Sequence, residues 1–277
     1  MPKRLKNSDI TYWTYGDSAK PPLLLIHGFT GSHEGFQYII PQLEKDFFII
    51  VPDLPGFGES PVPEKPWTVD ELARHTNTFV ASLGLNKQPY LVSHSLGSLV
   101  AASMLGQRPE LFAKKTVFIS PVATRIRLFD SRKVGSLLSA LHYGLGRQTG
   151  KAGSKLVKSK TISRTVTNIL MTTKHPVLQE QIQQHHFKNL EYISSIDYYH
   201  FLQRDIIRRG IIDYKLQLRS SHILLIAGNK DKVTPIKGAR LLARELPAQL
   251  EIIENVGHLA HYETPDEISK ALCGFLE

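Results

Sequence analysis

The chain has little of what secreted or membrane-spanning proteins need. Its 277 residues include one cysteine, Cys273, which excludes an internal disulfide. The longest apolar stretches, such as residues 23–26 and 47–51, are far too short to span a bilayer. The start of the chain is basic and polar, and no apolar run of a secretory signal follows it. The sequence therefore predicts a soluble cytoplasmic protein, although the mature form of a processed precursor would look the same.

The chain also has few signals for a cofactor, a metal or a nucleic acid. The glycine pairs at residues 56–58 (GFG) and 144–146 (GLG) lack the third glycine of a dinucleotide fingerprint. His185 and His186 lack the partner spacing of a zinc site, and we interpret them as surface histidines. The pI near 9.5 is not accompanied by a recognised nucleic-acid-binding motif. We predict no cofactor, no metal and no nucleic-acid partner.

Short apolar runs bounded by glycine, proline or aspartate are present, and they indicate buried parallel strands. Four lie in the first half of the chain, at residues 23–26, 47–51, 89–92 and 115–119. Segments of helical length lie between them, at residues 68–83 and 95–107. The first of these helices starts with Thr68 and has Glu71 three positions on, which predicts a capping box.

The same alternation returns near the end of the chain. We expect strands at residues 222–227 and 249–253, and helices at residues 235–245 and 265–276. Alternation on both sides predicts an α/β fold with one doubly wound, mostly parallel sheet.

The middle of the chain breaks that rhythm, because it is rich in Ser, Thr, Lys and Gln and has few convincing strands. We predict a core built from residues 1–122 and 218–277, with residues 123–217 inserted as a mainly helical cap over the carboxyl ends of the strands. An independent helical domain is the alternative.

The first chemical signal follows the strand expected at residues 89–92. Ser95 lies between that strand and a helix, in the run SHSLG, which is the setting of a nucleophile elbow. Small residues flank the turn at Ser93 and Gly97, although glycine is more usual at the first position. Ser95 at a helix N-terminus would lie near N–H groups that favour developing negative charge. Ser95 is therefore the candidate nucleophile, and a serine that only caps the helix is the alternative.

A glycine-containing loop, residues 27–32 (HGFTGS), follows the first strong strand. Acyl transfer needs two N–H donors for the oxyanion, one from the residue after the nucleophile and one from such a loop. We therefore predict that Leu96 and Phe29 form the oxyanion hole, with Gly28 allowing a tight turn. An ordinary glycine turn is the alternative, and His27 is expected to brace the loop.

The acid and the base are expected after the nucleophile, in that order. Asp231 and His258 each follow a predicted strand, so both fall at the sheet edge on which Ser95 lies. His261 is the rival base among 12 histidines, but Gly257 before His258 permits close approach. Two lysines flank Asp231, so a surface ion pair is its alternative role.

These motifs, in this order, resemble the α/β-hydrolase superfamily over about residues 10–122 and 218–277. The run at residues 53–60 (DLPGFGES) is similar to the family's turn after its second parallel strand, and its Asp53 and Ser60 are expected to be structural. The resemblance implies the family's fold and a serine hydrolase with the triad described above.

The residues around the elbow narrow the activity that the resemblance implies. Epoxide hydrolases and haloalkane dehalogenases carry an aspartate where this chain has Ser95. The following run, LGSL, lacks the arginine found in relatives of the menaquinone-pathway synthase. We therefore expect cleavage of a carboxylic ester or acyl substrate. A carbon–carbon bond hydrolase of ring-fission products and a non-enzymatic ligand-binding protein are the alternatives.

Positive charge is concentrated in the predicted cap. Residues 121–220 hold 17 Lys and Arg against 6 Asp and Glu, and the rest of the chain holds 17 against 19. A solvated helical face, weak attachment to an anionic membrane and attraction of acidic substrates are three interpretations. Apolar residues of the cap are expected to pack on the core or to line an acyl-binding cleft: Leu137, Leu138, Leu141, Ile169, Leu170, Phe187, Tyr198, Tyr199, Phe201 and Leu202.

Overall fold

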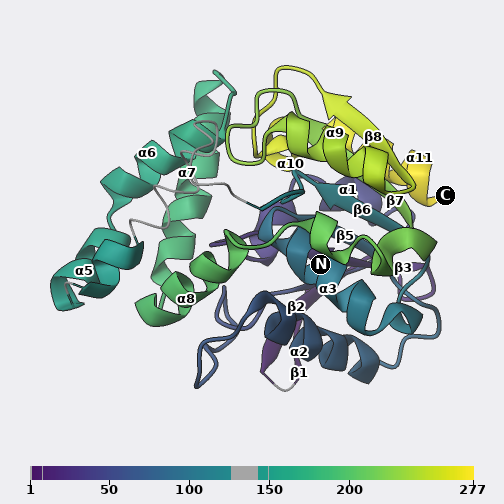
Figure 1. The fold of residues 1–277 in the computed structure, drawn as a ribbon, viewed down its shortest axis with the longest axis horizontal. Helices are drawn as coiled ribbons and strands as arrows, with labels where there is room; N and C mark the ends of the chain where they lie inside the picture. The colour runs from purple at the N-terminus through teal and green to yellow at the C-terminus, as the bar shows by residue number, and fades with distance from the viewer. Residues whose placement is uncertain (1, 8, 126–142, 149) are drawn as a thin grey trace.

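The computed structural model describes residues 2–7, 9–125, 143–148 and 150–277 (Figure 1). An eight-stranded sheet runs through it in the order β1-β2-β4-β3-β5-β6-β7-β8. Neighbouring strands from β4 to β8 are parallel, whereas β1 and β2 pair antiparallel at one edge. The predicted α/β class and the doubly wound, mostly parallel sheet are confirmed.

The elements of the core have the following bounds. The strands are β1 (Lys3–Asn7), β2 (Ile10–Tyr15), β3 (Pro22–Ile26), β4 (Phe48–Pro52), β5 (Tyr90–His94), β6 (Lys115–Ile119), β7 (His222–Gly228) and β8 (Ala248–Ile253). The helices are α1 (Ile40–Leu43), α2 (Val69–Ser82), α3 (Leu96–Gln107), α9 (Ile236–Glu245), α10 (Ala260–Glu263) and α11 (Pro265–Leu276), with 3-10 turns η1 (His33–Phe36) and η2 (Pro109–Leu111).

Alternate side chains of each central strand point to opposite faces of the sheet. In β3, Leu24 and Ile26 pack with α2 and α3, whereas Leu23 and Leu25 pack with α1 and α11. Because both faces are covered, the parallel strands are apolar throughout, as a buried parallel sheet requires.

Most core elements lie close to the residues predicted for them. β6 and α11 have the expected bounds, and α2 begins with the expected capping box between Thr68 and Glu71. The strands β1 and β2 were not predicted. They form an edge ribbon whose side chains are largely exposed in β1 and half of them only partly buried in β2, so neither has the apolar run used to find the others.

The described part of residues 123–217 is helical and contains no strand. Residues 143–148 form a helical stretch, followed by α5 (Gly150–Val157), α6 (Lys160–Leu170), α7 (Pro176–Glu191), α8 (Ile196–Ile206), η4 (Ile211–Tyr214) and η5 (Gln217–Ser220). The helices α5 to α8 lie together on one side of the molecule, at the left in Figure 1. We call residues 123–217 the inserted segment.

Buried tyrosines of α8 fasten the inserted segment to the core. Tyr198 donates a hydrogen bond from Oη to Pro55 O (2.7 Å), and Tyr199 donates one to Gly56 O (3.0 Å). Both rings pack against Phe57. None of the described helices, in this segment or in the core, is long and apolar enough to cross a membrane.

Candidate active site

The turn between β5 and α3 forces one residue into an uncommon backbone conformation. Ser95 has φ 52° and ψ −120°, which costs a residue with a side chain about 1–3 kcal/mol. Its N–H donates to Ile119 O of β6 at 3.1 Å. At Gly97 a Cβ would lie only 2.7 Å from His27 O, so only glycine lets α3 approach this closely. The strand–turn–helix expected at Ser95 is present, and the strands on either side hold it.

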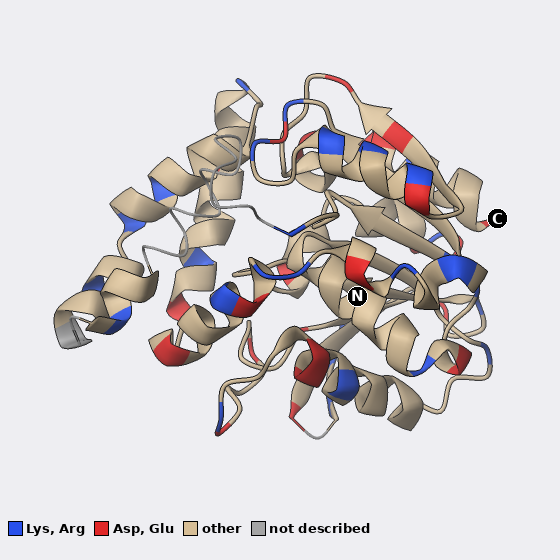
Figure 2. Ribbon diagram, viewed as in Figure 1, with Lys and Arg blue, Asp and Glu red and all other residues tan. Residues whose placement is uncertain are grey.

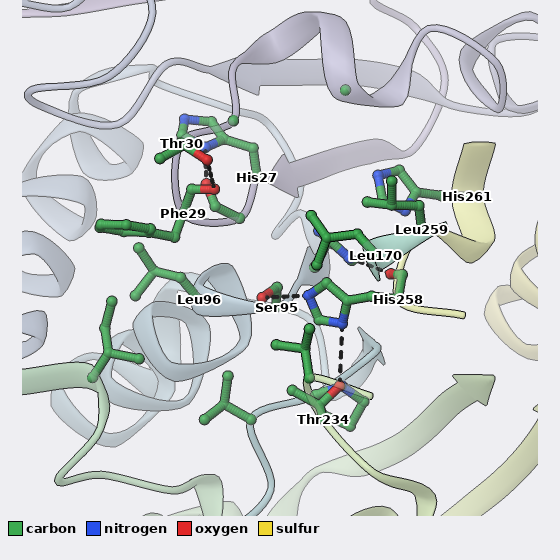
Figure 3. A pocket seen from close by; sticks show the side chains of 18 of the residues that line it. His27, Phe29, Thr30, Ser95, Leu96, Leu170, Thr234, His258, Leu259 and His261 are labelled. Carbon is green, nitrogen blue, oxygen red and sulfur yellow. Dashed lines mark hydrogen bonds between the residues drawn. The ribbon is translucent and has the colours of Figure 1, made fainter. Parts of the chain in front are cut away.

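The three residues predicted as a triad lie within hydrogen-bonding distance of one another. Ser95 Oγ is 2.9 Å from His258 Nε2, and His258 Nδ1 is 2.8 Å from Asp231 Oδ2. Figure 3 shows the Ser95 and His258 side chains facing each other. His258 and Asp231 are almost fully buried, whereas Ser95 is partly exposed. In this arrangement the imidazole donates from Nδ1 to the carboxylate, which leaves Nε2 to accept from the serine hydroxyl.

Hydrogen bonds from the loop after β7 stabilise the ionised carboxylate of Asp231, although this side chain is buried. Oδ1 accepts hydrogen bonds from the N–H groups of Val233 (2.7 Å) and Thr234 (2.8 Å), and Oδ2 accepts one from Thr234 Oγ1 (2.7 Å). Burial opposes the charge, but the neighbouring His258 and the bonds from Thr234 outweigh it, and the pKa of Asp231 lies below its usual value. Asp231 is 6% exposed and faces His258, so the alternative of a surface ion pair is wrong.

The backbone that carries His258 is held by the inserted segment. The N–H of His258 donates to Leu170 O at 2.9 Å, and the N–H of Gly257 donates to Thr172 Oγ1 at 3.1 Å. Glu263 Oε2 in turn accepts from the N–H and the hydroxyl of Thr172, each at 2.8 Å, and from the N–H of Thr173. We call Thr172 and Glu263 the histidine-loop clamp. Neither was found from the sequence, because both act through backbone that only the fold brings together.

The glycine-containing loop after β3 lies directly against the nucleophile. A Cβ on Gly28 would lie 3.1 Å from Ser95 Cβ. No described residue accepts a hydrogen bond from the N–H of Phe29 or of Leu96. In Figure 3 these two residues lie on one side of Ser95 and His258 lies on the other. Two unpaired N–H groups at this place are what an oxyanion hole needs.

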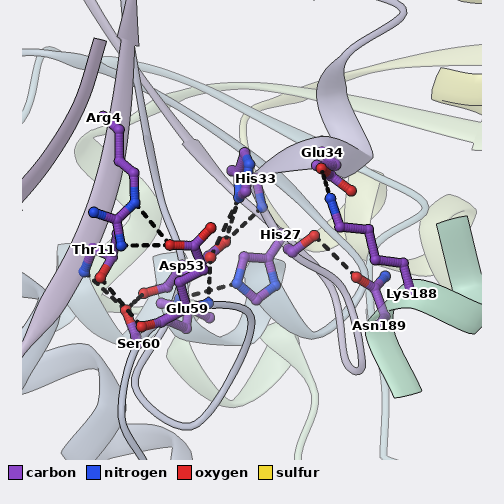
Figure 4. A network of polar contacts seen from close by, with 12 residues as sticks. Arg4, Thr11, His27, His33, Glu34, Asp53, Glu59, Ser60, Lys188 and Asn189 are labelled. Atoms are coloured by element: carbon purple, nitrogen blue, oxygen red, sulfur yellow. Dashed lines mark hydrogen bonds and ion pairs between the residues drawn. The ribbon is translucent and has the colours of Figure 1, made fainter. Parts of the chain in front are cut away.

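Histidine and carboxylate groups brace that loop from behind (Figure 4). His27 Nε2 accepts from the N–H of Leu54 (2.9 Å), while its Nδ1 donates to Gly28 O (2.8 Å). Asp53 is fully buried and accepts from the N–H of His33 (2.6 Å). The hydroxyl of Ser60 donates to Asp53 O (2.6 Å). The expectations that His27 braces the loop, and that Asp53 and Ser60 are structural, are confirmed.

A cavity of about 660 Å³ opens above Ser95 and runs across the sheet edge. One end, which we call the α10 end, lies over the sheet face covered by α1 and α11, and its lining includes Ser32, Phe36, His186, Asn189, His261 and Tyr262. The other end, the α9 end, lies over the opposite face, and its lining includes Ala123, Ile206, Ile212, Val233, Lys237 and Leu241. Val166, Ile169 and Leu170 of the inserted segment also line it. Apolar side chains predominate at the α9 end, although Thr124, Arg125 and Thr234 also line the cavity, whereas the side chains named for the α10 end are mostly polar or aromatic.

Of the apolar residues that were expected to pack on the core or to line a cleft, some do the first and some the second. Ile169 and Leu170 line the cavity, whereas Tyr198, Tyr199 and Leu202 belong to the main hydrophobic core. Phe187 is buried and Phe201 is exposed. Leu137, Leu138 and Leu141 lie outside the described residues.

Several buried histidines surround His258. His94 donates from Nε2 to His258 O (3.0 Å), and its ring centroid lies 4.1 Å from that of His261. Burial, followed by the neighbouring His258, lowers the pKa of His94 to about 3. His261, the rival base, is fully buried; it lies in α10 and is not within hydrogen-bonding distance of Ser95. The interpretation of His186 as a surface histidine is wrong, because it is partly buried and lines the cavity.

Lys and Arg are the charged residues of α5 and α6, whereas α7 and α8 carry Asp and Glu together with Lys188 and Arg204 (Figure 2). Arg147 pairs with Asp197 at 2.8 Å, and Arg164 lies over the Phe187 ring at 5.7 Å. Such partners fit a solvated helical face, and attraction of membranes or acidic substrates stays a prediction. Arg127, Arg132 and Lys133 lie outside the described residues. Among those described, no group of three or more His, Cys, Asp or Glu could hold a metal ion.

Known proteins match this chain over most of its length. Residues 21–265 match the model of a family described as alpha/beta hydrolase fold. Lipase 1 of Psychrobacter immobilis is 27% identical over 97% of this chain and 81% of its own. Monoacylglycerol lipase abhd6-B of Xenopus laevis is 25% identical over 93% of this chain and 75% of its own.

A solved structure has the same fold at lower identity. The 2-hydroxy-6-oxo-6-phenylhexa-2,4-dienoate hydrolase of Rhodococcus sp. strain RHA1 superimposes with a TM-score of 0.76, over 100% of this chain and 98% of its own, at 19% identity. The similarity in fold therefore extends over both the sheet and the inserted segment.

Proposed function

The chain belongs to the α/β-hydrolase fold family, and we propose that it is a serine hydrolase that cleaves a carboxylic ester through an acyl-enzyme. The observation that supports this most directly is the chain of hydrogen bonds from Ser95 through His258 to Asp231, beside the unpaired N–H groups of Phe29 and Leu96. The names of the two lipase relatives point to the same class of substrate.

In the first half of the reaction, Ser95 Oγ attacks the acyl carbon while His258 Nε2 takes the hydroxyl proton. Asp231 stabilises the imidazolium that forms and keeps the imidazole in the tautomer that can accept this proton. The N–H groups of Phe29 and Leu96 hydrogen-bond the oxyanion of the tetrahedral intermediate. When the intermediate collapses, His258 gives its proton to the departing alcohol, and the acyl group stays on Ser95.

In the second half, water takes the place of the alcohol. His258 Nε2 removes a proton from the water, which attacks the acyl carbon. The same two N–H groups again donate hydrogen bonds to the oxyanion. Ser95 leaves with the proton from His258, and the carboxylic acid is released.

The inserted segment completes this proposal as a cap that selects the substrate. Its residues contribute to the cavity wall, as Ile169 and Leu170 do, while none of them supplies a group of the triad. Apolar walls with a few polar groups are typical of ligand sites. We assign the acyl chain to the α9 end of the cavity, where apolar side chains predominate.

A substrate panel tests the proposed function. Propyl esters of acetate, butyrate, octanoate and decanoate are compared with a ring-fission dienoate, using the purified chain and the Ser95→Ala variant. We expect turnover of esters that the variant lacks, and little turnover of the dienoate.

Two results would contradict the proposal. Faster cleavage of the dienoate than of every ester would favour the carbon–carbon bond hydrolase. Saturable binding of the esters without turnover would favour a ligand-binding protein.

A further inference from the structure

The α10 end of the cavity carries two polar groups from one face of α7. His186 and Asn189 are three residues apart in this helix, so their side chains lie on the same side of it. Both line the cavity, and neither takes part in the proposed mechanism. Their remaining hydrogen-bonding capacity decides what this end of the cavity can hold.

The tautomer of His186 follows from its neighbour in α6. Thr167 Oγ1 donates its proton to Ser163 O at 2.8 Å, so it can only accept from His186 Nδ1, which lies 2.7 Å away. The proton of the neutral imidazole is therefore on Nδ1, and Nε2 presents a lone pair. No described residue donates a hydrogen bond to that nitrogen. Burial, followed by the neighbouring His185, lowers the pKa of His186 to about 4, which keeps the ring neutral near pH 7.

Asn189 presents a free hydrogen-bond donor, whereas His186 presents a free acceptor. Its Oδ1 accepts from the buried hydroxyl of Ser32 at 3.0 Å, which leaves the Nδ2 amide as a donor. No described residue accepts from Nδ2. The neighbouring cation, Lys188, is paired with Glu34. The α7 side chains that line this part of the cavity therefore offer one acceptor and one donor and no free positive charge, beside the hydroxyl of Tyr262.

A hydroxyl group is the ligand that fits such a pair, because it donates one hydrogen bond and accepts another. A carboxylate or a phosphate would face the lone pair of His186 without a compensating cation. An alkyl group would leave both polar groups without partners, which is costly in an enclosed site.

We propose that His186 and Asn189 form a subsite for a free hydroxyl on the alcohol portion of the ester, so that the substrate class is an acyl ester of an alcohol with two or more hydroxyls. This rests on the proposed ester hydrolysis. The acyl chain occupies the α9 end of the cavity, the ester carbonyl lies at Ser95, and the alcohol extends toward the α10 end.

Matched esters test the subsite in the wild-type protein. Decanoate esters of 1,2-ethanediol, 1,3-propanediol and 1,4-butanediol are compared with ethyl, propyl and butyl decanoate, by kcat/KM at pH 7.5. We expect the best hydroxyalkyl ester to exceed its alkyl partner by about tenfold, the value of one or two neutral hydrogen bonds. Propyl 10-hydroxydecanoate, with the hydroxyl on the acyl chain, should gain nothing over propyl decanoate.

Variants of α7 locate the effect. His186→Phe keeps a ring beside Tyr262 but removes the acceptor, and Asn189→Leu removes the donor. Each should reduce the hydroxyalkyl-to-alkyl ratio to within about twofold of unity. His185→Phe is the matched control, because His185 is next to His186 and does not line the cavity, so the ratio should stay near tenfold.

The outcomes separate this inference from the proposed function. Hydrolysis of neither series would overturn the proposed function. Equal hydrolysis of both series by the wild-type protein would overturn the subsite alone, and that result needs no variant to fold. A preference that persists in His186→Phe and Asn189→Leu, or a gain from the hydroxyl on the acyl chain, would also contradict it.

Discussion

The contacts within the sheet core differ from the contacts that attach the inserted segment to it. In the core, alternate side chains of each central strand are buried on the two faces of the sheet, and the triad residues stand on loops at the carboxyl ends of the strands. The inserted segment packs the buried rings of α8 on that core, and its Met171 and Ile182 pack with Leu259 and Tyr262 in a smaller apolar cluster. In addition, α7 and its preceding linker reach the core through polar bonds. These include Ser32 to Asn189 and Thr172 to Glu263.

The two regions also differ in what they contribute to the proposed reaction. The groups assigned to bond breaking all come from the core, whereas the residues that line the cavity come from both regions. Substitutions of the triad residues should therefore affect all substrates alike. Substitutions of cavity-lining residues in the inserted segment should change the ratio between substrates.

The largest effect is expected at the base. His258→Ala removes the proton acceptor, and kcat should fall by about four to six orders of magnitude for every ester. His261→Ala removes a buried ring that does not contact Ser95, so kcat should change by less than about tenfold, with some loss of stability from the cavity created. The two variants are compared by kcat on propyl decanoate. An equally severe loss in His261→Ala would mean that the base has been assigned to the wrong histidine.

The acid should come next. Asp231→Asn replaces an acceptor for His258 Nδ1–H with an amide that can favour the wrong tautomer, and kcat should fall by about 10⁴-fold. The loss should be similar for short and long acyl chains, because the carboxylate does not line the cavity. Loss confined to one chain length would place Asp231 in substrate selection instead.

The sequence was a good guide to the parts of the molecule whose role depends on local pattern. Apolar runs predict buried strands because both faces of this sheet are covered, and the order of motifs predicts Ser95, Asp231 and His258 because parallel strands end at one edge. The ribbon of β1 and β2 was missed because an edge strand needs no apolar run. His186, Asn189 and the histidine-loop clamp were missed because their partners are far away in sequence: Ser32 is 157 residues from Asn189.

The buried histidines make the core sensitive to acid. The pKa of His94 in the folded state is about 3, below the usual 6.5 that applies when the chain is unfolded, so the unfolded state binds more protons between these pH values. The contribution of such a histidine to the free energy of unfolding is therefore fully present above pH 6.5. It falls as the pH drops, by up to about 1.4 kcal/mol per pH unit for one such group. Urea unfolding at pH 7.5 and 5.0 should show this loss. His261→Asn should reduce it, while His222→Asn, at an exposed position, should not. A free energy of unfolding independent of pH in this range would contradict the prediction.

The histidine-loop clamp tests whether the inserted segment also supports the chemistry. Thr172→Val keeps the shape of the side chain but removes the hydroxyl that bonds Gly257 and Glu263. Without this hydroxyl the backbone that positions His258 is held less firmly. We expect kcat to fall by about tenfold with little change in KM, as expected for one or two hydrogen bonds. Thr172→Ser, which restores the hydroxyl, should recover most of the activity. A change in KM alone would mean that the clamp shapes the cavity rather than the position of His258.

The smallest effect is expected from the cavity wall. Ile212→Trp adds bulk to the α9 end of the cavity and should shift the preferred acyl chain to a shorter one, by about fourfold in kcat/KM for each methylene excluded. Val177→Trp is the control, because Val177 is exposed on α7 and does not line the cavity. The measurement is the kcat/KM profile over the acyl series. An unchanged profile in Ile212→Trp would place acyl selection in the core.

Acylation of Ser95 is the step on which the proposed reaction depends, and a fluorophosphonate probe tests the reactivity of Ser95 most directly. The probe is mixed with the wild-type protein, and the adduct is located by peptide mass spectrometry while ester hydrolysis is followed in the same sample. We predict one adduct per chain, on Ser95, formed in step with the loss of activity and absent from Ser95→Ala. An adduct on a neighbouring serine such as Ser93, or full ester hydrolysis by a protein that the probe does not label, would contradict it.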